Sequence, residues 1–274
     1  MPIVDTHVHC FAGPNDERFP YHPLGPYQPA KVATPERLLE LMDAAGVDFA
    51  VIVHPEPYQD DHRSLEHCLD VGNGRLKGVC HFFAHANDSV QRMIDLVRRR
   101  PGQIVALRIH AYAPERLPKF DSAELRTLCR AAADLGLALQ LHFEPRYATA
   151  LEPLVREFKS TPVLVDHLGR PFQGTADEYA TVLRWSERPN VSVKLSSLPV
   201  KEEYPHRDIT PIVQQLVAAF GADRLIYGGG FNADATAVSY RAARERVASQ
   251  LGSLSEADVA KVLGGNAAKL FGFV

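Results

Sequence analysis

The sequence lacks several features that would each point to a particular class of protein. Its four cysteines form no CxxC pair or other spacing typical of a metal site; they are Cys10, Cys68, Cys80 and Cys129. No apolar run approaches the roughly 18 residues of a membrane span, and no GxGxxG or Walker sequence follows a β-rich run. We therefore expect reduced, mostly buried thiols, no membrane partner and no nucleotide-binding loop.

The chain also has no large excess of charge of either sign. Its 30 Lys and Arg and 33 Asp and Glu residues leave a formal net charge of -3 over 274 residues. A basic patch that would bind nucleic acid is therefore not expected. The first residues, MPIVDTHVH, lack the basic and apolar regions of a signal peptide, so we expect a cytoplasmic protein.

Short β-rich runs alternate with helical patterns along the whole chain. The runs lie at about 2–9, 49–54, 77–83, 104–110, 137–143, 162–167, 191–196 and 224–228. Further helices are expected at about 88–99, 148–158, 177–186, 209–219, 236–250 and 255–263. Eight repeats of this alternation without a break in composition predict a single-domain (β/α)8 barrel over residues 1–274.

Two of the helices have clear end signals. Thr34 followed by Pro35 predicts the start of one helix, and Gly46 predicts its end. Asp121 and Glu124 have the spacing of a capping box before a helix that stops at Gly136.

Histidines fall at or near the ends of six successive β-rich runs. They are His7 and His9, then His54, His81, His110, His142 and His167. Parallel strands of a barrel all end at one face, and that face carries the active site. So many histidines in register at this face predict an enzyme.

Side chains two residues apart on a strand share one face. His7 and His9 are therefore expected to point together into the barrel, with Asp5 one step lower on the same side. Two imidazoles at this spacing can bind one divalent metal, and a third from another strand would complete a catalytic site.

The same alternation places cationic residues near the histidines. Arg108 shares a face with His110, and Gln140 shares one with His142. Lys194 stands in an apolar run where an unpaired charge would be costly, so we expect it to be ion-paired or functional. The planar guanidinium of Arg108 suits a carboxylate ligand.

The segment from Cys10 to about Ala33 is long and rich in proline and aromatic residues. Because it follows the first strand, we expect it to form a lid or pocket wall at the mouth of the barrel, where Tyr27 could bind substrate.

Four phrases of the sequence resemble the amidohydrolase superfamily, and more narrowly its amidohydrolase 2 branch. They are DTHVH, VDHLGRP, the KLS segment and LGGNAAKLFGF. The stretches FPYHP, TPERLLELMDAAGVDFAVIVHP and LKGV further resemble 2-pyrone-4,6-dicarboxylate lactonase and its relatives. The resemblance covers essentially the whole chain and implies a (β/α)8 barrel that hydrolyses lactones, amides or C–C bonds, or decarboxylates.

The resemblance also implies roles for individual residues. In metal-dependent members, His7, His9 and His142 would hold one metal, Zn or Mn, and His167 would assist catalysis. Lactonase-like members are often metal-independent, and there the histidines polarise the substrate carbonyl. Because Arg108 and His110 replace the bridging lysine of binuclear members, two metals are not expected.

One departure from the family pattern concerns the eighth strand. The family's GSDWP aspartate is replaced by Gly230 in IYGGGFNAD. A metal would lose a ligand and water its usual base. Asp234 or Asn232 could reach back to replace it, another group such as Glu144 or a histidine could act as base, or the protein does not hydrolyse its ligand.

The leading hypothesis is a hydrolase that opens a carboxylate-bearing lactone or related cyclic ester. The proposed catalytic residues are His167, His7, His9 and Asp234, and the proposed substrate-binding residues are Arg108, His54, His110, Lys194 and Tyr27. The alternatives are a decarboxylase on the same scaffold and a non-catalytic barrel that binds a small molecule. A homodimer is expected only by analogy with other barrels.

Overall fold

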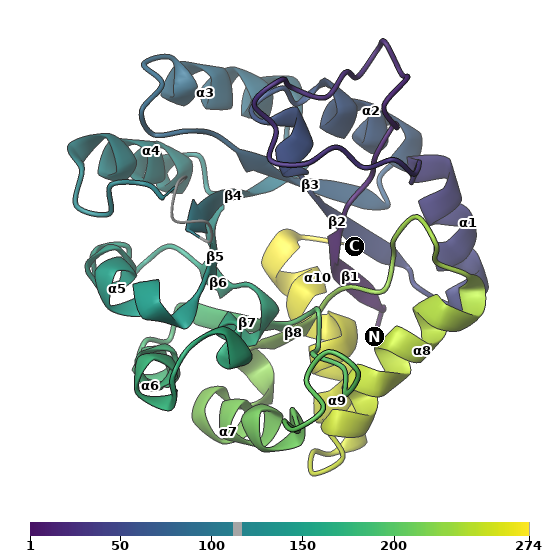
Figure 1. Ribbon diagram of the computed structural model, residues 1–274, viewed down its shortest axis with the longest axis vertical. Coiled ribbons are helices and arrows are strands. Elements are labelled where there is room, and N and C mark those ends of the chain that lie inside the picture. The colour runs from purple at the N-terminus through teal and green to yellow at the C-terminus, as the bar shows by residue number, and fades with distance from the viewer. Residues whose placement is uncertain (112–116, 274) are drawn as a thin grey trace.

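The computed structural model describes residues 1–111 and 117–273. Eight parallel strands follow one another in sequence order around one sheet (Figure 1). They are β1 (Val4–Val8), β2 (Phe49–Val53), β3 (Leu76–His81), β4 (Ile104–Ala111), β5 (Ala138–Phe143), β6 (Val163–Val165), β7 (Val191–Leu195) and β8 (Leu225–Tyr227). The (β/α)8 barrel predicted from the sequence is confirmed.

Most helices surround the strands on the outside, whereas α10 lies against one end of the barrel (Figure 1). The helices are α1 (Pro35–Ala45), α2 (Arg63–Gly72), α3 (Ser89–Arg99), α4 (Ala123–Asp134), α5 (Ala148–Glu157), α6 (Ala176–Arg184), α7 (Thr210–Phe220), α8 (Ala237–Gln250), α9 (Glu256–Ala260) and α10 (Asn266–Phe271). Among the described residues, no helix is both long and apolar enough to cross a membrane.

The helix ends follow the sequence signals with one correction. Thr34 caps α1 by accepting a hydrogen bond from the Arg37 N–H, and Gly46 ends it with φ of 70°. The cap of α4 is Ser122 rather than Asp121, because the Ser122 hydroxyl accepts from the Leu125 N–H at 3.1 Å. The sequence patterns also missed α2 and α10.

At the end where the strands begin, here called the lower end, the barrel interior is filled by small and branched side chains. These are Val4, Val51, Val53, Val79, Ala106, Ala138, Leu164 and Ile226, and α10 packs against them. With the lower end closed by this cluster, the polar side chains one or two steps further along the strands gather at the opposite mouth.

The seam between β8 and β1 is joined by side chains from the first strand. The Thr6 hydroxyl donates to the Tyr227 carbonyl at 2.7 Å, and Asp5 accepts from the Gly229 N–H at 2.6 Å. The pairing register of β1 with β2 shifts between Asp5 and Val8, so strict alternation fails there. Asp5 consequently bonds to the Tyr240 hydroxyl of α8, and the prediction that it shares a side with His7 is wrong.

Candidate active site

A buried carboxylate, Asp166 at the end of β6, is the centre of the polar cluster at the barrel mouth. Its Oδ2 accepts from Arg108 Nε at 3.0 Å and from Gln140 Nε2 at 3.1 Å. Its Oδ1 lies 3.5 Å from both Lys194 Nζ and His7 Nδ1. Side chains from four strands thus contact this one carboxylate. Because they lie far apart in the sequence, local patterns could not predict that they meet.

Two cations hold Asp166 in its charged form. Burial opposes ionisation of this carboxyl, but Lys194 and Arg108 outweigh it and hold the pKa of Asp166 well below its usual range. Burial lowers the pKa of Lys194 to about 8, against the opposing attraction of Asp166. Lys194 Nζ also donates to the Thr6 carbonyl at 2.6 Å, so the predicted buried lysine is ion-paired and hydrogen-bonded.

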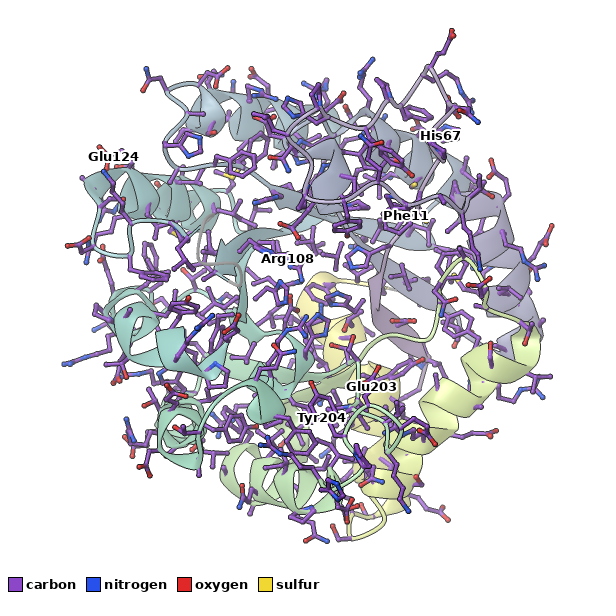
Figure 2. The ribbon with its side chains drawn as sticks, in the orientation of Figure 1. Phe11, His67, Arg108, Glu124, Glu203 and Tyr204 are labelled. Atoms are coloured by element: carbon purple, nitrogen blue, oxygen red, sulfur yellow. The ribbon has the colours of Figure 1, made fainter. Side chains whose placement is uncertain are left out.

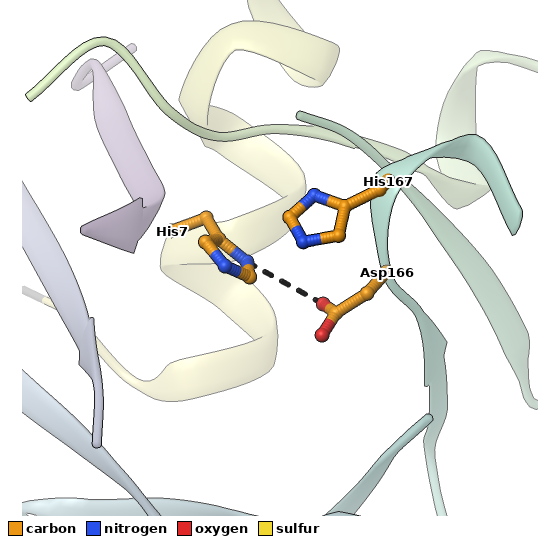
Figure 3. Close-up of side chains that lie close together, drawn as sticks. All are labelled: His7, Asp166 and His167. Carbon is orange, nitrogen blue, oxygen red and sulfur yellow. Dashed lines mark ion pairs between the residues drawn. The ribbon is translucent and has the colours of Figure 1, made fainter. Parts of the chain in front are cut away.

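His7 and His167 lie beside Asp166 with their ring centroids 4.4 Å apart (Figure 3). Burial, together with the charge of Lys194, lowers the pKa of His7 well below its usual value. Burial likewise lowers the pKa of His167, despite the opposing charge of Asp166. Both imidazoles are therefore neutral near pH 7.

Ser196 orients the His167 ring. Its hydroxyl accepts from the His167 N–H at 3.3 Å and lies 2.9 Å from His167 Nδ1. The backbone is strained at this point, because His167, Leu168 and Arg170 have φ between 52° and 57°. Such strain in three residues other than glycine is typical of a functional loop.

His142 is held from both sides of its ring. Its Nδ1 lies 3.1 Å from His110 Nδ1, and its Nε2 accepts from Arg170 Nε at 2.9 Å. His110 in turn places Nε2 3.2 Å from Glu56 Oε1. Both ring nitrogens of His142 thus face protein groups, and its role as a metal ligand stays a prediction.

His9 points its ring toward the mouth but is partly committed. Its Nδ1 donates to the Val53 carbonyl at 2.7 Å, and its ring lies 5.1 Å from that of His7. Burial, reinforced by Arg108, lowers the pKa of His9 to about 4. His9 is thus a neutral neighbour of the cluster.

Three of the predicted site residues lie outside the cluster. Asp234 has a side chain that is 70% exposed and pairs with Lys31, so it does not replace the missing aspartate. His54 follows the inward-facing Val53 and stacks on His62 at the start of α2, with ring centroids 4.3 Å apart. Tyr27 is 48% exposed on the segment that follows β1.

Gly230 cannot be read as a deleted aspartate. Its φ is 139°, and a Cβ at this position would lie 2.7 Å from Tyr240 Cδ2 and 3.1 Å from Ala243 Cβ. A side chain would therefore point at α8 rather than at the cluster.

The most informative residue missed from the sequence is Asp166. Its signal was present in VDHLGRP, because Leu164 faces the interior and alternation carries Asp166 to the same side. Arg170 and Glu56 had no such signal, since they lie in loops after their strands.

The donor set fits the divalent metal that the family resemblance implies. His7, Asp166 and His167 each offer one atom, and these atoms lie within 4.8 Å of one another. Both ring nitrogens of His7 and Oδ1 of Asp166 are buried without a hydrogen-bond partner among the described residues. Two imidazoles and one carboxylate suit zinc or manganese. The set differs from the predicted one, which combined His7 with His9 and His142.

A pocket of about 410 Å³ opens beside the cluster. It is lined by His167, Arg170, Pro171, Phe172, Gln173, Ser197, Pro199, Glu203 and Tyr204. His167 thus faces both the buried carboxylate and a space large enough for part of a small molecule.

The mouth of the barrel gathers neutral imidazoles, a buried carboxylate and cations. This arrangement at the carboxyl ends of the strands is typical of enzymes with a (β/α)8 barrel. The chain belongs to the amidohydrolase family, in its amidohydrolase 2 branch, because the family model described as Amidohydrolase matches residues 4–273. The resemblance recognised in the sequence is confirmed.

Similar proteins include named lactone hydrolases. The 4-sulfomuconolactone hydrolase of Hydrogenophaga intermedia is 25% identical over 230 residues, which are 82% of this chain and 72% of that protein. The structure of a probable 2-pyrone-4,6-dicarboxylic acid hydrolase of Acinetobacter baumannii with citric acid bound has a TM-score of 0.79 at 21% identity, and both chains are fully covered. A zinc-bound amidohydrolase of Burkholderia multivorans has a TM-score of 0.73 at 19% identity, again over both whole chains. The two structures share the fold with this chain.

Proposed function

We propose that this protein hydrolyses a lactone that carries a carboxylate. The observation that carries the proposal is the hydrogen bonding of the Arg108 guanidinium. Its Nε is fixed by Asp166 at 3.0 Å, and no other hydrogen bond of its guanidinium is present among the described residues. The terminal amino groups form an oriented fork, and a substrate carboxylate is the natural partner for this geometry.

The likeness to 4-sulfomuconolactone hydrolase and to a pyrone dicarboxylate hydrolase supports the same reaction class. Both names describe cyclic esters that bear anionic groups. The surplus of cations at the barrel mouth, with Lys194 and Arg108 around a single Asp166, agrees with an anionic substrate.

The chain's own residues supply binding and proton transfer. Arg108 orients the substrate through its carboxylate, and His167, oriented by Ser196, is placed to donate a hydrogen bond to the developing oxyanion. In the metal-free protein, neutral His7 has Nδ1 3.5 Å from Asp166, and its Nε2 can accept a proton from water.

A divalent metal bound by His7, Asp166 and His167 would polarise the scissile carbonyl and lower the pKa of a bound water. Metal content before and after chelation, compared with activity, distinguishes the two forms of the enzyme.

The test compares a carboxylated lactone with its methyl ester. Muconolactone and 2-pyrone-4,6-dicarboxylate are suitable probes. In Arg108→Met, kcat/KM for the carboxylate should fall by about two orders of magnitude, mainly through KM, because a bidentate ion pair to the substrate is lost. The methyl ester should be hydrolysed at a similar low rate by both proteins, and Arg92→Met on α3 serves as the arginine control.

His167→Ala should remove turnover of both probes. Equal loss on ester and carboxylate in Arg108→Met would show that the arginine does not bind the carboxylate. Release of carbon dioxide without ring opening would show that the protein is a decarboxylase and not a lactone hydrolase.

A further inference from the structure

The pocket beside His167 lies between two loops at the carboxyl ends of neighbouring strands. One wall comes from the segment after β6 and contains Pro171 and Phe172. The other comes from the segment after β7 and contains Pro199 and Tyr204, of which Tyr204 is labelled in Figure 2. The pocket therefore extends the candidate active site in one direction, starting at His167.

Two prolines and two aromatic rings form the apolar part of the walls. The rings of Phe172 and Tyr204 have centroids 5.2 Å apart at an interplanar angle of 58°. Together with the two prolines they form surfaces that suit a flat group, because aromatic rings pack in offset or edge-to-face arrangements at such distances.

Two polar side chains of the pocket offer acceptor atoms. Gln173 lines it, and its buried Oε1 has no partner among the described residues. Glu203 also lines it and makes no ion pair among the described residues. Arg170, the one cation of the lining, donates both Nε and Nη2 to His142. The charge of Glu203 disfavours a second carboxylate in the pocket, and two of the Arg170 nitrogens are directed at His142.

The wall after β7 is held in place at both ends. Arg207 donates to the Phe172 carbonyl at 3.1 Å and places its guanidinium 5.4 Å from the Phe172 ring centroid. Arg246 of α8 donates to the carbonyls of Leu198 and Pro199. These contacts link the two walls and the helix behind them, so the pocket is part of the fold.

We propose that this pocket binds the substituent of the lactone that lies on the His167 side of the scissile ester. It takes a flat, uncharged group with a hydrogen-bond donor, such as a hydroxyphenyl ring, in preference to a second carboxylate. The assignment of the bound molecule as a lactone rests on the proposed function, whereas the chemistry of the pocket does not.

The first experiment measures binding of 4-methylphenol to the purified protein by ligand-observed NMR. Tyr204→Ala should weaken binding at least fivefold, because an aromatic wall is lost. Gln173→Leu should weaken binding of 4-methylphenol but not of 4-methylanisole, which has no donor. Tyr147→Ala is the matched control, since Tyr147 is a half-buried tyrosine in another tilted ring pair, with Phe120, outside the pocket.

Equal loss in Tyr204→Ala and Tyr147→Ala, or no loss in Tyr204→Ala, would overturn the proposal. Tyr204-dependent binding of 4-methylbenzoate that is tighter than that of 4-methylphenol would also overturn it.

The second experiment compares a carboxylated lactone with and without a 4-hydroxyphenyl substituent. Tyr204→Ala should lower kcat/KM for the substituted lactone about tenfold more than for the unsubstituted one. If the wild-type protein hydrolyses neither lactone while the 4-methylphenol results hold, the proposed function fails and the pocket assignment stands.

Discussion

Asp166 shows how neighbouring cations can set the charge of a buried side chain. Lys194 and Arg108 keep it ionised, whereas burial and the charge of Lys194 keep His7 and His167 neutral against the attraction of Asp166. The same Oδ1 that could bind a metal lies 3.5 Å from the Lys194 ammonium. The Lys194 cation therefore disfavours metal binding at this site and favours binding of an anionic substrate.

Replacing Lys194 by methionine should increase the affinity for zinc. The substitution removes a positive charge close to the ligand oxygen, and at an effective dielectric constant near 20 this repulsion is worth several kcal/mol. We expect the zinc dissociation constant to fall by at least about tenfold, measured by competition with a chromogenic chelator.

Lys77→Met provides the control, because Lys77 donates to the Phe271 and Gly272 carbonyls at the opposite end of the barrel. An unchanged zinc affinity in Lys194→Met would mean that His7, Asp166 and His167 are not the ligands.

At the scale of single elements, departures from regular geometry decide where side chains point. The register shift in β1 turns Asp5 toward α8 and leaves His7 in the barrel. The turn after β8 directs position 230 toward Tyr240. Assigning Asp5 and position 230 from residue type and the family pattern alone therefore places both on the wrong side of the strand.

Introducing a side chain at position 230 should destabilise the fold. Gly230→Ala combines a left-handed backbone with an overlap against Tyr240 and should lower the free energy of unfolding by about 2 to 4 kcal/mol. Gly74→Ala has φ of 87° and open space around the added Cβ, so it isolates the backbone cost of about 1 kcal/mol. Urea denaturation of both variants measures the difference.

Gly230→Asp should be destabilised in the same way and should gain no hydrolytic activity. A stable Gly230→Asp variant with increased turnover would show that the position faces the site after all.

For the whole molecule, closing the barrel buries many histidines in their neutral form. Burial lowers the pKa of His7, His9, His54, His62, His142 and His167. Below about pH 6.5 the unfolded chain binds protons at these residues and the folded chain does not. These histidines therefore do not reduce the free energy of unfolding above that pH, and the free energy of unfolding decreases as the pH falls toward 4.

Each of these histidines should cost about 1 kcal/mol of stability per pH unit below 6.5. Denaturation midpoints measured from pH 7 to pH 5 with chelator present give the slope. His54→Gln should reduce the slope by about 1 kcal/mol per pH unit, which corresponds to the uptake of one proton on unfolding. The reason is that burial lowers the pKa of His54 to about 4. His206→Gln, at an exposed position, should leave it unchanged, and equal effects of the two substitutions would contradict the assignment.

The (β/α)8 barrel follows from the sequence alone, because eight alternations of apolar strands and amphipathic helices have few other ways to bury their apolar faces. It also placed His7, His9, His142 and His167 at the mouth, since parallel strands all end at one face. The metal set, the site roles of the histidines and the lid role of the segment after β1 stay predictions.

Which polar groups meet depends on the three-dimensional fold. Asp166 gathers Arg108, Gln140 and Lys194 from three other strands, and Arg170 donates to His142 Nε2. The irregular turn at Gly230 and the surface pair of Asp234 are likewise set by packing against distant residues. Local patterns fix the direction of a side chain along a regular strand, whereas bulges, left-handed loops and long-range ion pairs depend on neighbours far along the chain.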